Sequence, residues 1–228
     1  MINILLENVS LYYPSNTKNI SLRKKIINST FGKNIKNNHI EALSNINLKL
    51  NEGIYGLYGE NGSGKTSLLK ILAKIYEPTI GNVNINGTVA SLINIHFGFN
   101  EELTGLENIE LKLVLSEVHY KDIKSLSKEI ADDCDLEEYL QLPLRTYSSG
   151  MRFRLAFFIA KHLNSDILLM DEWIGTGDEK LRDIVDNIIN EKISKSKITI
   201  IASHNLERLK KICTKIFYLK NGRISNTK

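Results

Sequence analysis

A glycine-rich run in the first third of the chain has the residue types needed to hold a phosphorylated ligand. Residues 59–66 read Gly-Glu-Asn-Gly-Ser-Gly-Lys-Thr, follow an apolar run and lead into a helical pattern, the context that the motif G-x-x-x-x-G-K-[ST] requires. Glycines let backbone N–H groups turn toward phosphates, Lys65 reaches the terminal phosphates, and the Thr66 hydroxyl can bind Mg²⁺. We therefore predict a nucleoside triphosphate site. Its predicted contacts are Gly59, Asn61, Gly62, Ser63, Gly64, Lys65, Thr66 and Ser67.

Two adjacent acids further along the chain suit the hydrolysis of such a ligand. Residues 167–172 read Ile-Leu-Leu-Met-Asp-Glu, an apolar strand that ends in two carboxylates. At the end of such a strand, Asp171 would lie beside Mg²⁺. Glu172 would hold the attacking water as a general base, a role that contributes roughly 10²- to 10⁴-fold in rate. We predict Asp171 and Thr66 as the metal-side residues and Glu172 and Lys65 as catalytic.

These groups must be brought together by the elements around them. The short apolar runs 54–58, 167–170 and 198–202 predict central parallel strands, whose carboxyl ends meet at one edge of a sheet. Runs 2–13, 42–50 and 83–90, with a turn signal at Asn86-Gly87, predict an antiparallel β portion. Helical spacing over 106–139 predicts a helical lobe inserted into an α/β core, and an Asn-Gly turn follows a strand at 216–219. The predicted fold class is α/β.

Composition narrows the class of protein. The chain has 228 residues, 42% of them hydrophobic, and a net charge of +4. No apolar run approaches the ~18 residues that a membrane-spanning helix requires. Its start does not resemble a secretory signal, so we expect a cytoplasmic protein. Six lysines and arginines gather in the acid-free segment 14–40. They are not spread along a face that carries stacking aromatics, so nucleic acid is not an expected partner.

A third motif separates this chain from other P-loop enzymes. Residues 147–151 read Tyr-Ser-Ser-Gly-Met and open an amphipathic helix just before the acidic strand. They resemble the signature motif of ATP-binding-cassette (ABC) ATPases, usually Leu-Ser-Gly-Gly-Gln. The resemblance implies that Ser148, Ser149 and Gly150 contact the γ-phosphate of ATP held on a second copy of the chain. ATP would then join a homodimer.

The same resemblance extends to other positions. His204, after the strand 198–203, stands where this class has a histidine that contacts the γ-phosphate and orients the water, and we include it as catalytic. Tyr13 occupies the position of the aromatic residue that stacks on adenine, with Tyr12 a close competitor. Asp178 matches an aspartate in a loop that crosses the dimer interface.

One expected part is missing, because no glutamine stands where the core joins the lobe. Residues 98–105, Gly-Phe-Asn-Glu-Glu-Leu-Thr-Gly, resemble the Gly-Phe-His-x-Glu-Leu-Thr-Gly stretch of O-antigen and teichoic acid exporters. Residues 171–178 are similar to the Asp-Glu-x-x-x-x-Gly-Asp stretch of that subfamily. Whether Asn94 or His96 replaces the glutamine stays open.

The resemblance implies one ABC ATPase domain over 1–228, with 1–93 and 164–228 as the core, 94–163 as the lobe and 14–40 as a basic insertion. It would use ATP and Mg²⁺ to drive two copies of an integral membrane subunit that export a lipid-linked polysaccharide. It would act at the cytoplasmic face of a bacterial membrane. The alternatives are an ABC ATPase for another substrate, such as an importer subunit, a soluble regulatory ABC ATPase, or a P-loop phosphotransferase.

Overall fold

The first of two β-sheets is antiparallel and is built mainly from the N-terminal part of the chain. The computed structural model describes residues 1–14, 39–93, 98–171 and 179–225. Strands β1 (Asn3–Pro14), β2 (His39–Leu50) and β4 (Ile80–Asn86) pair in the order β2-β1-β4. Buried residues alternate with exposed ones along the second half of β2, as expected for a sheet with one covered face. The predicted antiparallel portion is confirmed.

The second sheet holds the central strands. Its order is β5-β6-β7-β3-β8-β9, with bounds β3 Gly53–Tyr58, β5 Val89–Ser91, β6 Ile167–Asp171, β7 Ile198–Ser203, β8 Lys215–Lys220 and β9 Arg223–Ser225. All pairs are parallel except β8 with β9. Every residue of β7 is buried, as expected for a strand covered on both faces. The three predicted central strands are confirmed.

One strand prediction is wrong in part. The run 83–90 was expected to be wholly antiparallel. Its residues 83–86 are the last four of β4, but residues 89–90 belong to β5 in the parallel sheet. The chain turns at Gly87, whose φ of +130° disfavours a side chain. Asp166, next to β6, then accepts hydrogen bonds from the backbone N–H and the hydroxyl of Thr88, both at 2.9 Å. These bonds fix the start of β5 beside β6.

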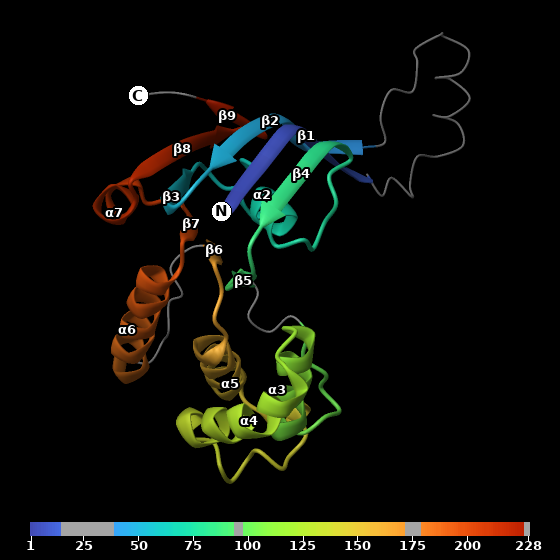
Figure 1. Cartoon of the computed structure of the whole chain (residues 1–228), viewed down its shortest axis with the longest axis vertical. Coiled ribbons are helices and arrows are strands. Elements are labelled where there is room, and N and C mark those ends of the chain that lie inside the picture. The colour runs from blue at the N-terminus through green and yellow to red at the C-terminus, as the bar shows by residue number, and fades with distance from the viewer. Residues whose placement is uncertain (15–38, 94–97, 172–178, 226–228) are drawn as a thin grey trace, which may run out of the picture.

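Helix α2 (Lys65–Leu72) packs between the two sheets, as Figure 1 shows. Its Leu68 and Leu69 are fully buried, which stabilises the fold by roughly 1.5–3 kcal/mol for each side chain. Side chains of β6 are buried on both faces of its sheet. Ile167 and Leu169 belong to the hydrophobic cluster around α2, whereas Leu168 and Met170 belong to a second cluster. The sheet thus has a hydrophobic core on each side.

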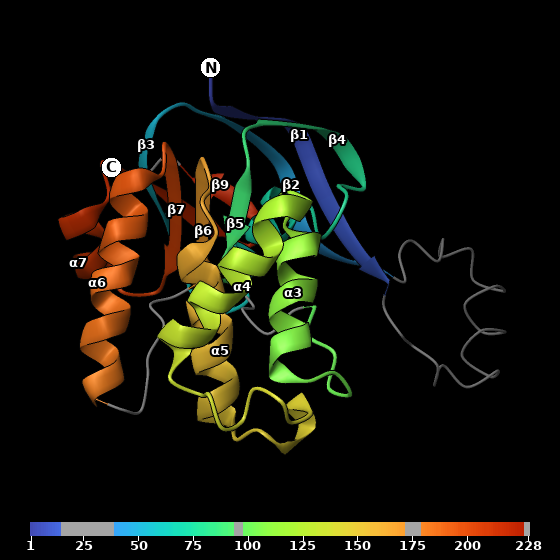
Figure 2. The same ribbon diagram turned by 60° about the horizontal axis from the view of Figure 1, so that its bottom comes forward.

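The second cluster contains the helical lobe. Its helices are α3 (Gly105–Leu115), α4 (Tyr120–Cys134) and α5 (Ser149–His162), with a 3₁₀ turn at Leu144–Thr146. They gather at one end of the molecule, with α6 (Glu179–Lys195) beside α5 and the short α7 (Leu206–Ile212) near β8 (Figures 1 and 2). Thr104 and Glu107 form a capping box at the start of α3. In the described ranges, no helix is both long and apolar enough to cross a membrane.

Candidate functional site

The three predicted site strands end at one edge of the parallel sheet. Strand β7 lies between β3 and β6, with Tyr58 opposite Ser203 and Asp171 opposite Ala202. The P-loop follows β3, the acid Asp171 ends β6, and His204 follows β7. The register therefore brings three segments that are far apart in the sequence to the same edge.

The P-loop has the backbone geometry that its glycines permit. Gly64 caps α2 with φ +107°, and a Cβ there would lie 2.7 Å from the Ala42 carbonyl oxygen. Gly62 has φ +78°, and a Cβ there would meet nothing within 4 Å. A positive φ at both positions favours glycine. The open space at Gly62 leaves room for a ligand against the loop.

Lys65 holds a buried positive charge inside this loop. The residue is 6% exposed, and its Nζ donates to the carbonyl oxygens of Gly59 at 2.7 Å and Glu60 at 3.1 Å. In the described part of the chain, no carboxylate forms an ion pair with it. A buried ammonium held only by neutral carbonyls is stabilised by an incoming anion. The loop therefore suits a phosphate ligand.

Thr66 and Asp171 come together beside the loop. The Thr66 hydroxyl donates to the Asp171 carboxylate at 2.6 Å, although the two residues are 105 positions apart. A hydroxyl oxygen and a carboxylate oxygen, with substrate phosphates nearby, are ligands of the kind that Mg²⁺ prefers. These two side chains fit a magnesium ion bound together with a nucleotide.

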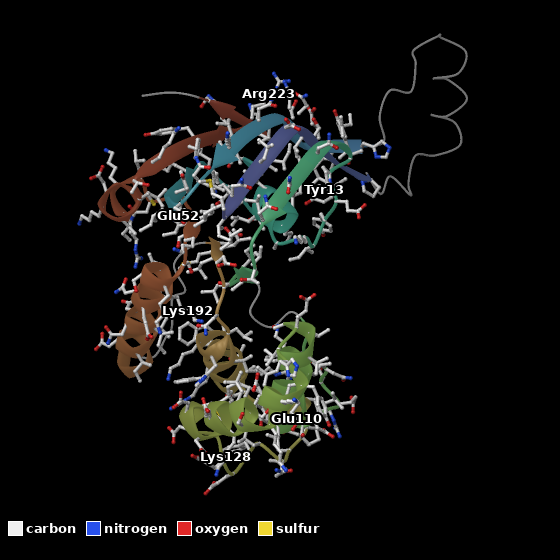
Figure 3. All side chains as sticks on the ribbon, in the orientation of Figure 1. Tyr13, Glu52, Glu110, Lys128, Lys192 and Arg223 are labelled. Carbon is white, nitrogen blue, oxygen red and sulfur yellow. The ribbon has the colours of Figure 1, made fainter. Side chains whose placement is uncertain are left out.

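The pocket around these groups also contains an aromatic ring. It has a volume of about 520 Å³. Tyr13, at the end of β1, shares a 3.1 Å hydrogen bond between its hydroxyl and that of Ser67, and its ring meets Tyr76 edge-on at 5.8 Å. Tyr12 is not among the described lining residues, and its hydroxyl donates to Glu41 at 3.0 Å. Figure 3 shows Tyr13 with the antiparallel sheet, at the other end of the molecule from Lys128 on the lobe. The lining residues are Tyr13, Ile40, Glu41, Ala42, Asn61, Gly62, Gly64, Lys65, Thr66, Ser67, Ile93 and Asp171.

Two supports of the pocket were not predicted from the sequence. Ile40, Glu41 and Ala42 form one wall because β2 pairs with β1 so that Ile40 lies opposite Tyr13. The Asn221-Gly222 turn, which was predicted only as a turn, also supports the P-loop. The Gly222 N–H donates to the Ser63 carbonyl oxygen, and its own carbonyl oxygen accepts from the Ser44 N–H, both at 2.9 Å. Only the three-dimensional pairing of the strands brings these residues together.

The predicted signature residues lie at the start of α5. Ser148 is the N-cap, and its hydroxyl accepts from the Met151 N–H at 3.2 Å. Ser148, Ser149 and Gly150 are all exposed. None of the three is among the described residues that line the pocket. This helix N-terminus, with no acid in its first turn, suits an anion that comes from outside the chain's own pocket.

Of the five other residues singled out from the sequence, the structure describes one. His204 is exposed just after β7 and is outside the described pocket lining. Glu172, Asp178 and the pair Asn94 and His96 lie outside the described residues, as does most of the basic insertion. Asp171, next to Glu172 in the chain, ends β6 at the pocket wall.

A buried amide in the lobe was not predicted from the sequence. Asn108 of α3 is 0% exposed, and its Nδ2 donates to the carbonyl oxygens of Asn100, Leu103 and Thr104 at 2.9–3.1 Å. Its Oδ1 accepts from the Asn100 N–H at 2.8 Å. This one side chain therefore holds the turn before α3 onto the helix.

The end of the stretch 98–105 lies against the signature motif 147–151. The Tyr147 hydroxyl donates to the Tyr139 carbonyl oxygen at 2.7 Å, and a Cβ at Gly105 would lie 2.1 Å from that hydroxyl. Burial raises the pKa of Tyr147 to about 12, so this hydroxyl stays protonated and donates at neutral pH. The absence of a side chain at Gly105 makes room for the tyrosine that precedes the signature serine.

Comparison with known proteins identifies the family. The ABC transporter family profile matches residues 43–175. The O-antigen export system ATP-binding protein RfbE of Yersinia enterocolitica is 37% identical, over 98% of this chain and 97% of the relative. The teichoic acids export ATP-binding proteins TagH of Bacillus anthracis and Staphylococcus haemolyticus are 40% and 35% identical. Those matches cover 80% and 98% of this chain, and 33% and 83% of the respective relatives.

Solved structures have the same fold. A dimeric post-hydrolysis state of the ATP-binding cassette MJ0796, bound to ADP and Pi, superposes with a TM-score of 0.71 at 22% identity, over 98% of this chain and 97% of that one. Another dimeric structure of MJ0796 gives a TM-score of 0.70 over the same shares of both chains. The P-loop, the acidic strand and the inserted lobe agree with this assignment. The chain belongs to the ABC transporter family, as an ATP-binding ATPase subunit.

Proposed function

We propose that this protein is the ATP-hydrolysing subunit of an exporter that moves a lipid-linked polysaccharide, of O-antigen, capsule or teichoic acid type, across the cytoplasmic membrane. The observation that best supports ATP hydrolysis is the 2.6 Å hydrogen bond between Thr66 and Asp171, because it joins the P-loop to the acidic strand. The cargo part rests on the relatives named for O-antigen and teichoic acid export. The stretch at residues 98–105 supports the same subfamily.

Each site residue has a proposed role in hydrolysis. Lys65 and the P-loop N–H groups bind the phosphates, and Thr66 and Asp171 hold Mg²⁺, which neutralises developing charge when bound. Glu172 takes a proton from the attacking water. His204 holds the γ-phosphate and orients that water. Tyr13 stacks on the adenine and is positioned by its hydrogen bond to Ser67.

We propose that two copies complete each other's sites. The N-terminus of α5 carries two serines and a glycine but lies outside the chain's own described pocket lining. In a head-to-tail homodimer, Ser148, Ser149 and Gly150 would bind the γ-phosphate held by the partner copy. The dimeric state of the structurally similar cassettes agrees with this arrangement.

The membrane part of the proposal concerns a separate subunit. Val114, Leu115 and Tyr120 lie close together in the sequence around the loop between α3 and α4 and are 56%, 60% and 86% exposed, so they are available for contact with a partner. We propose that two copies of an integral membrane subunit bind the ATPase dimer at the cytoplasmic face and are driven by its opening and closing. The chain would act as one cassette domain over 1–228, with its core at 1–93 and 164–228 and its lobe at 94–163.

The first experiment tests the ATP-dependent dimer. The Glu172→Gln protein, in which hydrolysis is blocked, is examined by size-exclusion chromatography with light scattering, with and without Mg-ATP. We expect a shift from monomer to dimer with Mg-ATP that the added substitution Ser148→Arg abolishes. A protein that binds ATP but stays monomeric would contradict the shared sites in solution. Transfer of phosphate to an added small-molecule acceptor would instead favour a phosphotransferase.

A second experiment tests the cargo. The complex with the co-purifying membrane subunit is reconstituted in lipid nanodiscs, and its ATPase activity is measured with a lipid-linked oligosaccharide or with the same lipid lacking the sugar. We expect stimulation only by the sugar-linked lipid. Stimulation by neither lipid would favour another transported substrate. Failure to isolate any membrane subunit would favour a soluble regulatory ATPase.

A further inference from the structure

Arg152, in the first turn of α5, makes contacts that point away from the helix body. All three nitrogens of its guanidinium have acceptors. Nε donates to the Tyr147 carbonyl oxygen at 3.3 Å, and one terminal nitrogen donates to the Arg145 carbonyl oxygen at 3.3 Å. The other donates to the Glu101 carboxylate at 2.7 Å. The side chain therefore reaches back past the N-terminus of its own helix, the direction that helical geometry favours.

The two carbonyls belong to the backbone that leads into Ser148. We call residues 147–150 the signature turn, and residues 98–104, which lead into α3, the linker turn. Glu101 lies in the linker turn, and its own carbonyl oxygen accepts from the Arg145 N–H at 3.0 Å. Buried Asn108 fixes the linker turn onto α3. Arg152 thus connects the linker turn, which Asn108 holds in place, with the signature turn, which carries Ser148.

The linker turn follows a residue of the nucleotide pocket closely in the sequence. Ile93 lines that pocket, and the chain then runs through residues 94–97 into the linker turn. Because the proposed dimer places the signature turn on the partner's ATP, the contact between Arg152 and Glu101 bears on the shared site.

We propose that Arg152 is a positioning residue that, through Glu101, holds the signature turn in the geometry that binds ATP on the partner copy. This inference rests on the proposed shared site. An exposed ion pair alone is worth little. The Arg152 side chain, however, is only 28% exposed and has three acceptors, and charge-assisted hydrogen bonds of this kind are the stronger ones.

The chain offers a matched control two residues along the same helix. Arg154 also forms a 2.7 Å contact with a carboxylate, that of Asp135, and its side chain is 30% exposed. Its partner follows the C-terminal end of α4 and is outside both turns. Arg154→Gln therefore removes a similar ion pair from the lobe without touching the signature turn.

The test measures ATP-driven dimerisation in the Glu172→Gln background. We expect Arg152→Gln to raise the ATP concentration for half-maximal dimerisation at least about tenfold, as expected for losing a charge-assisted hydrogen bond. Glu101→Gln should raise it less, because Arg152 keeps its two carbonyls, and the double substitution should add nothing to Arg152→Gln. Binding of a fluorescent ADP analogue to the P-loop should not change. Arg154→Gln should leave the midpoint unchanged.

A second measurement separates this inference from the proposed function. Hydrogen exchange of backbone amides 145–152 is measured in the nucleotide-free protein, where no dimer is needed. We expect faster exchange in Arg152→Gln and Glu101→Gln but not in Arg154→Gln. Unchanged exchange, or an equal dimerisation shift in Arg154→Gln, would overturn the positioning role. If the parent protein fails to dimerise, the shared site fails, and exchange at the signature turn alone decides whether Arg152 positions it.

Discussion

Two hydrogen bonds fix the Lys65 side chain at the start of the P-loop. Its Nζ donates to the carbonyl oxygens of Gly59 and Glu60. Ordering such a long side chain costs up to ~1.5–2 kcal/mol of conformational entropy, which these contacts help to offset. The Thr66 hydroxyl is fixed in the same way by its hydrogen bond to Asp171.

The Thr66 hydroxyl gives a direct test of the magnesium site. Thr66→Ala removes the oxygen proposed to bind Mg²⁺ and leaves Asp171 without its donor. We expect the Mg²⁺ concentration for half-maximal ATPase activity to rise by about 10- to 100-fold, the usual cost of disturbing a metal site. Thr66→Ser, which keeps the hydroxyl, should stay close to the wild type. Equal Mg²⁺ dependence in Thr66→Ala and the wild type would exclude Thr66 as a ligand.

Gly105 allows a test of the contact between the start of α3 and Tyr147 of the signature turn. A Cβ at this position would lie 2.1 Å from the Tyr147 hydroxyl oxygen. We expect Gly105→Ala to lower the free energy of unfolding by about 1–3 kcal/mol, the range for overpacking. Adding Tyr147→Phe removes the clashing oxygen and should restore part of the loss, measured by urea denaturation. If the double variant is less stable than Gly105→Ala, the clash is not the cause.

At this scale, the sequence predicted the residues of the P-loop and Asp171 but not the residues that support them. Motif spacing identifies Lys65 because the chemistry requires that residue type at that place. Asn108 has no such signal, since an asparagine inside a helical pattern is usually disfavoured or solvent-exposed. Its importance comes from three carbonyl oxygens and one N–H that only the folded chain gathers around it.

Among the elements, α6 shares a hydrophobic core with α5, and one of its lysines also binds the end of α5. Lys192 lies on α6, and its Nζ donates to the carbonyl oxygen of Leu163, the C-cap of α5. Burial, followed by the nearby charge of Lys195, lowers the pKa of Lys192 to about 8, although Glu191 acts in the opposite direction. The contact therefore depends on pH in a range that experiments can reach.

The sign of this dependence follows from proton binding. Between about pH 8 and the ordinary lysine pKa of about 10.4, the unfolded chain binds more protons at this residue than the folded chain does. The stability of the wild type relative to Lys192→Met should therefore increase from about pH 7.5 to about pH 9.5. Urea denaturation at several pH values measures this difference. Lys128→Met, which changes an exposed lysine on α4, is the control, and an equal slope in both variants would contradict the assignment.

The elements themselves were largely predictable, with one exception that has a physical cause. Short buried runs bounded by turns predicted β3, β6 and β7, and helical spacing predicted the lobe. The run 83–90 was assigned to one sheet because an apolar pattern gives a strand but not its partner. The change of sheet at Gly87 depends on the bonds between Thr88 and Asp166, which are 78 positions apart in the sequence.

For the whole molecule, the separation of the signature turn from the described pocket lining predicts complementation between two inactive variants. Lys65→Met disables the P-loop, and Ser148→Arg disables the signature. A mixed dimer contains one site with both parts intact and one site with neither. We therefore expect ATPase activity to appear when the two inactive proteins are mixed, measured by phosphate release. If mixtures at every ratio stay inactive, either both sites must be intact in one dimer or the sites are not shared.

Asn108 also offers a way to observe the lobe in solution. Its amide group is fully buried and its two protons are shared among three carbonyl oxygens. In an asparagine-labelled sample, this NH₂ group should give a pair of resonances shifted away from those of exposed amides and slow to exchange with solvent. Because the linker turn must keep its place for these bonds to persist, the two resonances would report, from the monomer to the reconstituted transporter, whether the lobe moves as a rigid body or loosens where it joins the core.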